Sequence, residues 1–235
     1  MTKTKYFLIA ALIAMLVIPA AAKKTKTATN ENGVLTDQRI GYTMEVPDNW
    51  KVKTYKESED NPAVLRVLMS QKNYQINREV EELDGDYIIP EIQVYARQDT
   101  MSPEGFLEKL KNAVELRNSG DDIISQLGLV MEGEFVQSGE AELGGLPVIV
   151  AYFKRNWERH LQADPGDPRY RHTGGLIVRE THDIHEVYIL KHGGDLIVIQ
   201  GLCEAEFYHN ILMAEFGKII GSLKFGDIEK SDAGQ

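Results

Sequence analysis

Residues 181–186 hold the chain's densest group of side chains able to do chemistry. The sequence there is Thr-His-Asp-Ile-His-Glu, so two imidazoles and two carboxylates occur within five residues. Zinc and similar metals use these ligand types. His182, Asp183, His185 and Glu186 are therefore candidate metal ligands, and a metal-binding protein or metal-dependent hydrolase is one functional hypothesis.

The segments around this cluster favour a different interpretation. Residues 175–181 and 185–191 are predicted strands, and positions three apart in a strand lie on opposite faces. His182 and His185 converge only if a turn separates the two strands. The His-Glu-x-x-His pattern of zinc proteases is absent. A solvated connection between two strands is the favoured alternative.

A second candidate is the long loop over residues 160–175. Its sequence Asp-Pro-Gly-Asp-Pro is followed by Arg169, Arg171 and His172. Long loops are often functional, and arginines suit an acidic ligand or partner. These three residues form a candidate ligand or partner loop. The alternative is a flexible loop whose charges face water.

Other chemistry-bearing residues have simpler interpretations. The acidic residues around Gly85 could hold a hard cation, although they lack an EF-hand's ordered ligand pattern, so a solvated loop is favoured. The only cysteine, Cys203, ends an apolar strand, where a small buried hydrophobe is expected rather than a nucleophile. Four strand aromatics could line a ligand groove, but their positions favour core packing: Trp50, Tyr152, Phe153 and Trp157.

Residues 1–22 have the pattern of a secretory signal peptide. Lys3 and Lys5 precede twelve apolar residues, 7–18, and a run of three alanines follows before Lys23. Twelve residues are too few to span a bilayer, and no later segment is long enough. We therefore expect an exported protein, periplasmic or extracellular, with no transmembrane segment.

The charge of the chain limits its partners. The formal net charge is −10, and loss of Lys3 and Lys5 with the signal makes it −12. An acidic surface repels nucleic acid and anionic lipid. Gly-x-Ser-x-Gly, phosphate-loop and dinucleotide signatures are all absent. We expect a non-enzyme that binds a protein or small ligand of the cell envelope, with no cofactor unless a divalent metal binds.

The hydrophobic pattern predicts one domain over residues 34–226, after a flexible tether at 23–33 and before a disordered tail at 227–235. Residues 40–55 alternate as two strands about a tight turn. Further predicted strands cover residues 64–70, 88–96, 132–142, 147–157 and 196–203. Helices are predicted from Ser102 to Gly120, from 121 to 129, and from 208 to 223. The fold class is α+β, with a central antiparallel sheet flanked by helices.

Two stretches resemble the PsbP family. Residues 41–50, Gly-Tyr-Thr-Met-Glu-Val-Pro-Asp-Asn-Trp, are similar to its opening hairpin, with Asn49 in place of the usual glycine. Residues 219–225, Ile-Ile-Gly-Ser-Leu-Lys-Phe, resemble its closing helix. The resemblance implies an α/β/α sandwich and a superfamily composed mostly of binding or assembly factors. The leading hypothesis is a non-catalytic exported binding or assembly factor.

Overall fold

The computed structural model describes residues 24–58, 63–72, 74, 84–85, 88–164, 166–169, 171–205 and 213–226. The predicted signal peptide, the predicted tail and most of the acidic stretch around Gly85 lie outside these ranges. Residues 208–212, the start of the predicted C-terminal helix, also lie outside them.

The main sheet has eight strands, all antiparallel to their neighbours. Seven follow one order across the sheet: β10 (Gly133–Leu143), β11 (Leu146–Gln162), β12 (Leu176–His192), β13 (Asp195–Glu204), β9 (Glu91–Gln98), β7 (Leu65–Gln71) and β5 (Trp50–Thr54). The short strand β8 (Asp84–Gly85) pairs with the far end of β11.

Two smaller sheets stand beside the main sheet. One has four strands in the order β14 (Lys224–Phe225), β4 (Tyr42–Glu45), β3 (Val34–Asp37) and β2 (Thr29–Glu31). The other pairs β1 (Thr25–Lys26) with β6 (Lys56–Glu57). These strands connect the N-terminal region to the rest of the domain.

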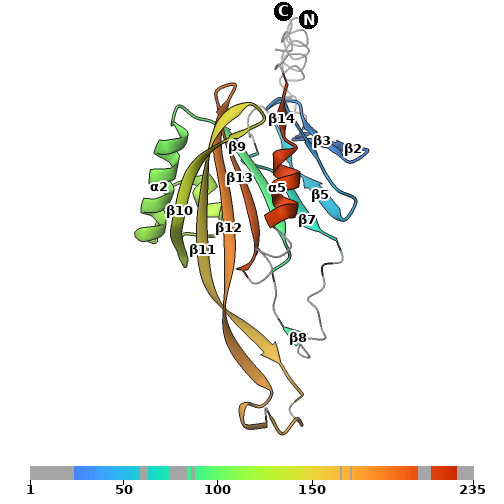
Figure 1. Ribbon diagram of the computed structural model, residues 1–235, viewed down its shortest axis with the longest axis vertical. Coiled ribbons are helices and arrows are strands. Elements are labelled where there is room, and N and C mark those ends of the chain that lie inside the picture. Colours follow the sequence, from blue (N-terminus) through green and yellow to red (C-terminus); the bar gives the residue numbers. More distant parts are fainter. Residues whose placement is uncertain are drawn as a thin grey trace, which may run out of the picture.

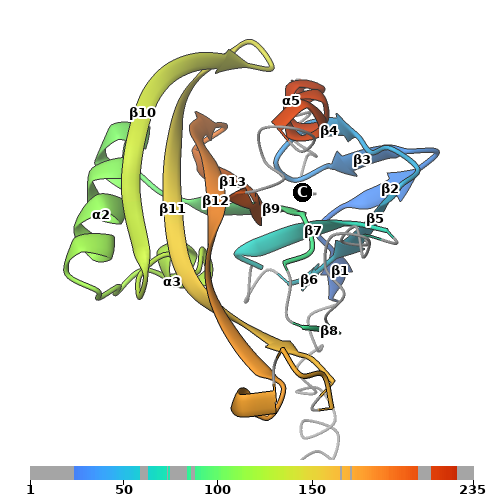
Figure 2. The same cartoon turned by 60° about the horizontal axis from the view of Figure 1, so that its bottom comes forward.

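The layers lie on the two faces of the main sheet (Figures 1 and 2). Helices α2 (Pro103–Glu115) and α3 (Asp122–Gln126) cover one face. The four-stranded sheet and α5 (Met213–Gly221) cover the other. The expected antiparallel α+β architecture is confirmed. The expected helices on both faces are present in part: α2 and α3 form one layer, whereas on the opposite face the single helix α5 shares the layer with a second sheet.

Local sequence signals explain both helices of the first layer. Ser102 caps α2, its hydroxyl accepting a hydrogen bond from the Gly105 amide at 3.1 Å, and Pro103 follows at the first helical position. Asp121 caps α3 by accepting from the Ile123 and Ile124 amides. These caps fix where each helix begins.

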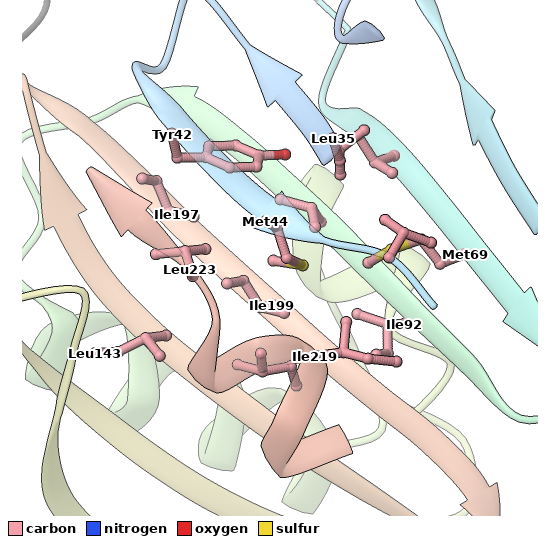
Figure 3. Packing of buried hydrophobic residues seen from close by; sticks show 14 of the residues in the cluster. Leu35, Tyr42, Met44, Met69, Ile92, Leu143, Ile197, Ile199, Ile219 and Leu223 are labelled. Carbon is pink, nitrogen blue, oxygen red and sulfur yellow. The ribbon is translucent and has the colours of Figure 1, made fainter. Parts of the chain in front are cut away.

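The core is double because β13 is buried on both faces. Ile197 and Ile199 face the four-stranded sheet and α5 (Figure 3). Leu196 and Val198 face α2 and α3. A strand covered on both sides reads as a continuous apolar run in the sequence. The turn before it uses Gly193 and Gly194, both at positive φ, as the predicted hairpin requires.

Three predictions about local structure need correction. Residues 40–55 do not form a hairpin, because β4 pairs with β3 and β14 whereas β5 pairs with β7 in the main sheet. Residues 24–31, expected to be a flexible tether, contain β1 and β2. The C-terminal helix ends at Gly221, and the chain then forms β14.

A buried arginine joins all three sheets. Arg66 of β7 is fully buried, and its guanidinium contacts Asp37 of β3 at 3.0 Å and Glu57 of β6 at 2.6 Å. It also donates to the Thr27 carbonyl at 3.3 Å. Burial alone raises the pKa of Glu57, but the hydrogen bond and charge of Arg66 outweigh it and hold that pKa below its usual range.

We expect Arg66→Ala to lower the free energy of unfolding by about 3–5 kcal/mol, because it removes the cation that pairs with the buried Asp37 carboxylate and the shorter of the two cation contacts of Glu57. Chemical denaturation of the variant measures this loss. Arg169→Ala is the control, since the Arg169 side chain is 63% exposed and pairs with Asp167 at the surface. Its expected cost is about 1 kcal/mol or less. Equal losses for the two variants would contradict the central role of Arg66.

Candidate functional site

A long β-hairpin projects from the body of the protein (Figure 1). Strands β11 and β12 are each 17 residues long and pair continuously from Ile149 opposite Ile189 to Gln162 opposite Leu176. We call residues 156–182 the arm. Residues 182–184 therefore lie within one strand, and the predicted connection between two strands at this place is wrong.

The continuous strand separates the four candidate metal ligands. Asp183 and His185 point toward the face covered by α2 and α3, whereas His182 and Glu186 lie on the opposite face. No group of three or more His, Cys, Asp or Glu side chains in the described parts of the chain is placed to hold a metal ion. The cluster that is dense in sequence is divided in space.

Asp183 and His185 form a buried polar group at the base of the arm. The Arg155 guanidinium lies 2.6 Å from Asp183, and His185 Nε2 lies 3.3 Å from the same carboxylate. The Gln200 amide contacts His185 Nδ1 and donates to the Leu127 carbonyl at 3.0 Å. These contacts tie β11, β12 and β13 to the end of α3.

Burial governs the ionisation of this group. It lowers the pKa of His185 further than the Asp183 carboxylate raises it, so His185 is neutral at neutral pH. Burial raises the pKa of Asp183, but its contacts with His185 and Arg155 outweigh that effect and hold it below its usual range. The group is suited to stabilising the arm rather than to binding a ligand.

Glu186 and Cys203 are both buried on the opposite face of the main sheet, the face covered by the four-stranded sheet and α5. The Glu186 carboxylate is buried and accepts hydrogen bonds from the Tyr152 and Tyr188 hydroxyls at 3.0 and 2.6 Å. Cys203 is buried, as expected, and burial together with neighbouring carboxylates such as Glu186 raises the pKa of its thiol. A protonated, buried thiol is a poor nucleophile.

A second ion pair anchors the arm itself. Arg159 of β11 pairs with Glu204 of β13, and both side chains are at most 5% exposed. The Ile88 amide donates to the same carboxylate at 2.8 Å. An isolated two-stranded hairpin is marginally stable in water. The pair therefore helps to hold the arm in one orientation relative to the main sheet.

The tip of the arm carries the predicted partner loop. The loop was predicted at residues 160–175, but β11 stays paired with β12 as far as Gln162, so the loop covers residues 163–175. It includes a short 3-10 helix, Arg171–Thr173. Arg169, Arg171 and His172 are all exposed there. The Arg169 guanidinium pairs with Asp167 at 2.7 Å. The structure therefore places all three candidate residues at the exposed tip of the arm.

Gly175 closes this tip. Its φ is +86°, and the Ala163 amide donates to the Gly175 carbonyl at 2.8 Å. A Cβ at this position would lie 2.5 Å from the Ala163 carbonyl oxygen. Only glycine fits both the backbone angle and the close approach of the two strands.

An open groove of about 530 Å³ lies at the base of the arm. Its lining includes Lys154, Asn156, Trp157 and Glu158 of β11 with Glu180 and His182 of β12. Arg117 and Glu132 line it from outside the arm. Core packing, predicted for all four strand aromatics, holds for Trp50 and Phe153, whereas Trp157 is half-buried and lines this groove.

The sequence interpretation missed most of this groove. His182 was singled out for a different role, and Trp157 was considered as a groove residue but assigned to core packing. The available signal was Trp157 itself, which stands among charged and polar residues in Lys-Arg-Asn-Trp-Glu-Arg-His instead of in an apolar run. A large aromatic residue in such surroundings favours a partly exposed contact position.

The fold and the arm define an antiparallel α+β protein with a projecting β-hairpin. No family model and no curated protein matches the chain. In the described residues, no helix is both long and apolar enough to cross a membrane.

Solved structures that are similar to the chain include the following three. The cyanobacterial PsbP protein CyanoP of Synechocystis sp. PCC 6803 has 11% identity and a TM-score of 0.44, covering 89% of this chain and 96% of its own. LpqN, involved in cell envelope biogenesis of Mycobacterium tuberculosis, has 14% identity and a TM-score of 0.40, with 90% and 95% covered. A Bacteroides thetaiotaomicron protein has 12% identity and a TM-score of 0.36, with 79% and 45% covered.

The first of these structures belongs to the family that residues 41–50 and 219–225 resemble. At these identities and TM-scores no residue role, ligand or partner passes from any of the three to this chain.

We expect His185→Gln to flatten the pH dependence of stability between pH 5 and pH 7. His185 is neutral in the folded protein, whereas in the unfolded chain it takes up a proton below about pH 6.5. The contribution of His185 to the free energy of unfolding is therefore complete above that pH and decreases as the pH falls. The slope of unfolding free energy against pH should decrease by up to about 1.4 kcal/mol per pH unit.

Denaturant unfolding at several pH values measures this slope, and His160→Gln is the control because the His160 side chain is 56% exposed. The control should keep the slope of the unmodified protein. A slope that persists in His185→Gln would show that the buried histidine does not cause it.

Proposed function

We propose that the protein is a non-catalytic, exported binding or assembly factor of the cell envelope, and that the arm is its binding element. The observation that carries this proposal is the arm itself, whose strands extend beyond the body and end in an exposed tip (Figure 1). Arg169, Arg171 and His172 would meet the partner there. Binding residues are often carried by loops on a rigid scaffold.

The distribution of polar contacts supports a binding role. At the base of the arm, Asp183 and Glu204 are engaged by Arg155 and Arg159 and hold the strands to the sheet. Toward the tip, Leu176 and Val178 are each 49% exposed. The base is thus built for rigidity, and the distal part offers charged and apolar surface for contact.

The chemistry of the conspicuous side chains supports a non-catalytic role. His185 is buried, Cys203 is buried with a raised pKa, and Glu186 accepts from two tyrosine hydroxyls. A metal-dependent hydrolase is not favoured, because His182 and His185 lie on opposite faces of β12. The signal peptide expected at residues 1–22 supports the proposed export. The resemblance to a superfamily of binding factors supports the proposed class of protein.

Site-specific photo-crosslinking in cells that export the protein tests this proposal. We expect a benzophenone side chain at Arg171 and one at His172 to give the same discrete adduct, because both positions are exposed at the tip. Glu140, exposed on β10, is the control position and should give none. Equal adducts from Glu140, or none from the tip, would contradict the proposed role of the arm.

A further inference from the structure

We propose that two copies of this chain associate through the arm, packed face to face with their arms running in opposite directions. The surface involved is one face of the arm, formed by alternate residues from Asn156 to Gln162 on β11 and from Leu176 to His182 on β12. We call it the arm face. The inference goes beyond the proposed function and does not depend on it, because its contacts join two copies of this chain.

The register of the arm places these side chains together. Directly opposed residues of an antiparallel pair lie on the same face, and here Glu158 is opposite Glu180 and His160 is opposite Val178. Leu176, two residues before Val178, shares that face. All five side chains are exposed. The arm face is therefore open to a second molecule.

Leu176 and Val178 form the apolar centre of the arm face. Each of the two side chains is 49% exposed. On the opposite face of the arm, by contrast, Leu161 is 1% exposed. Neighbouring apolar side chains that remain exposed are typical of a contact surface. The two faces of the arm thus differ, and the arm face is the one that offers apolar area to a second molecule.

Opposite charges lie on the two sides of this apolar centre. Toward the base of the arm, the opposed Glu158 and Glu180 carboxylates repel each other unless a cation joins them. Glu158 lies 3.8 Å from the His160 ring. Toward the tip, Arg171 and His172 are exposed. In the described parts of the chain, no ion pair engages Glu180 or Arg171.

The order of basic, apolar and acidic groups along the arm is self-complementary. A two-fold axis that reverses the direction of one arm exchanges its basic and acidic ends, as an isologous dimer requires. With the axis between the rows of Leu176 and Val178, Leu176 of each copy packs on Val178 of the other. Arg171 at each tip then meets Glu180 near the base of the second arm. The same attractive contact is made twice.

The size of the arm face sets the strength expected for this dimer. At about 3.3 Å per residue, the stretch from Asn156 to Gln162 is about 20 Å long, which is small for a protein interface. We therefore expect a reversible dimer with a Kd in the micromolar range. The net charge of −12 expected for the exported chain opposes association, but at physiological salt this repulsion is screened beyond about 8 Å. The contacts within the interface lie inside that distance.

The edge strand β10 is the alternative surface for joining two copies. It carries three exposed carboxylates, Glu134, Glu140 and Glu142, and its register is irregular between Phe135 and Gln137. Pairing two such strands would bring like charges together, and charges and bulges on edge strands oppose pairing with another chain. The arm face instead brings unlike charges together.

Sedimentation of the exported protein at increasing concentration, at physiological salt, tests the proposal. We expect a monomer–dimer equilibrium with a Kd in the micromolar range. Two double variants each reverse one charged end, namely Glu158→Lys with Glu180→Lys, and Arg171→Glu with His172→Glu. Each should raise the Kd at least about tenfold, because like charges then face each other at both contacts.

An equimolar mixture of the two double variants is the most specific measurement. In a mixed pair, the new lysines of one copy face the new glutamates of the other. At the second contact, Arg171 faces the unmodified Glu180. Both contacts are attractive again, so the mixture should dimerise with a Kd within about threefold of the unmodified value, although neither variant does so alone.

Glu140→Lys with Glu142→Lys is the control, because it makes the same charge change on the exposed strand β10. It should not raise the Kd. A protein that remains monomeric at about 1 mM would overturn the proposal. So would a Kd that neither arm variant changes, a mixture that remains monomeric, or a loss of association in the control.

The mass of the crosslinked product separates this interface from the proposed function. An adduct formed at Arg171 with the mass of two copies of this chain comes from the arm face, whereas an adduct of any other mass comes from a different partner. A monomer in sedimentation beside an adduct of other mass would remove the dimer alone. A dimer that is the sole source of adducts would remove the proposed envelope partner alone.

Discussion

The position of one buried guanidinium determines how the three sheets fit together. Arg66 belongs to the main sheet, yet its partners are Asp37 in the four-stranded sheet, Glu57 in the two-stranded sheet and the Thr27 carbonyl between β1 and β2. Sheets of two and four short strands bury too little apolar surface to be stable alone. A charge that is costly to desolvate becomes favourable only when all of these partners are assembled around it. The arrangement therefore makes the small sheets an integral part of the domain.

The core depends on that arrangement. Leu35, Tyr42 and Met44 of the four-stranded sheet pack over Met69, Ile92 and Ile199 of the main sheet (Figure 3). Without the four-stranded sheet, one face of β13 would be covered only in part by α5. The polar contacts of Arg66 and the apolar contacts of this layer thus stabilise each other.

The elements that could be predicted from the sequence are those determined by local signals. The strand pattern of residues 64–70, the alternation in residues 88–96, the Ser102 cap and the Gly193–Gly194 turn each act over a few residues. The structure contains the corresponding elements. The pairing of strands was harder to predict from the sequence. Alternation tells which face a side chain occupies but not which strand lies beside it. Residues 40–55 were therefore given a hairpin that the structure replaces with two strands in different sheets.

Long-range partners also explain the misinterpreted cluster at residues 181–186. Buried charges interrupt an apolar strand pattern, and the groups that satisfy them lie far away in sequence, as Arg155 does for Asp183 and Tyr152 for Glu186. The exposed residues of the arm tip could be found from composition and loop length alone. The groove needed the register of β10, β11 and β12, which places Trp157 and Glu158 just beyond the point where β10 begins.

The pairing of β14 with β4 has a consequence for the order in which the chain can fold. Phe225 lies opposite Tyr42, and the Gly226 amide donates to the Gly41 carbonyl at 2.9 Å. Polypeptides are synthesised from the N-terminus, so β3 and β4 emerge long before the strand that completes their sheet. Until residues 224–226 have left the ribosome, the four-stranded sheet lacks its β14 edge strand. The four-stranded sheet is therefore completed only by the last segment that the structure describes.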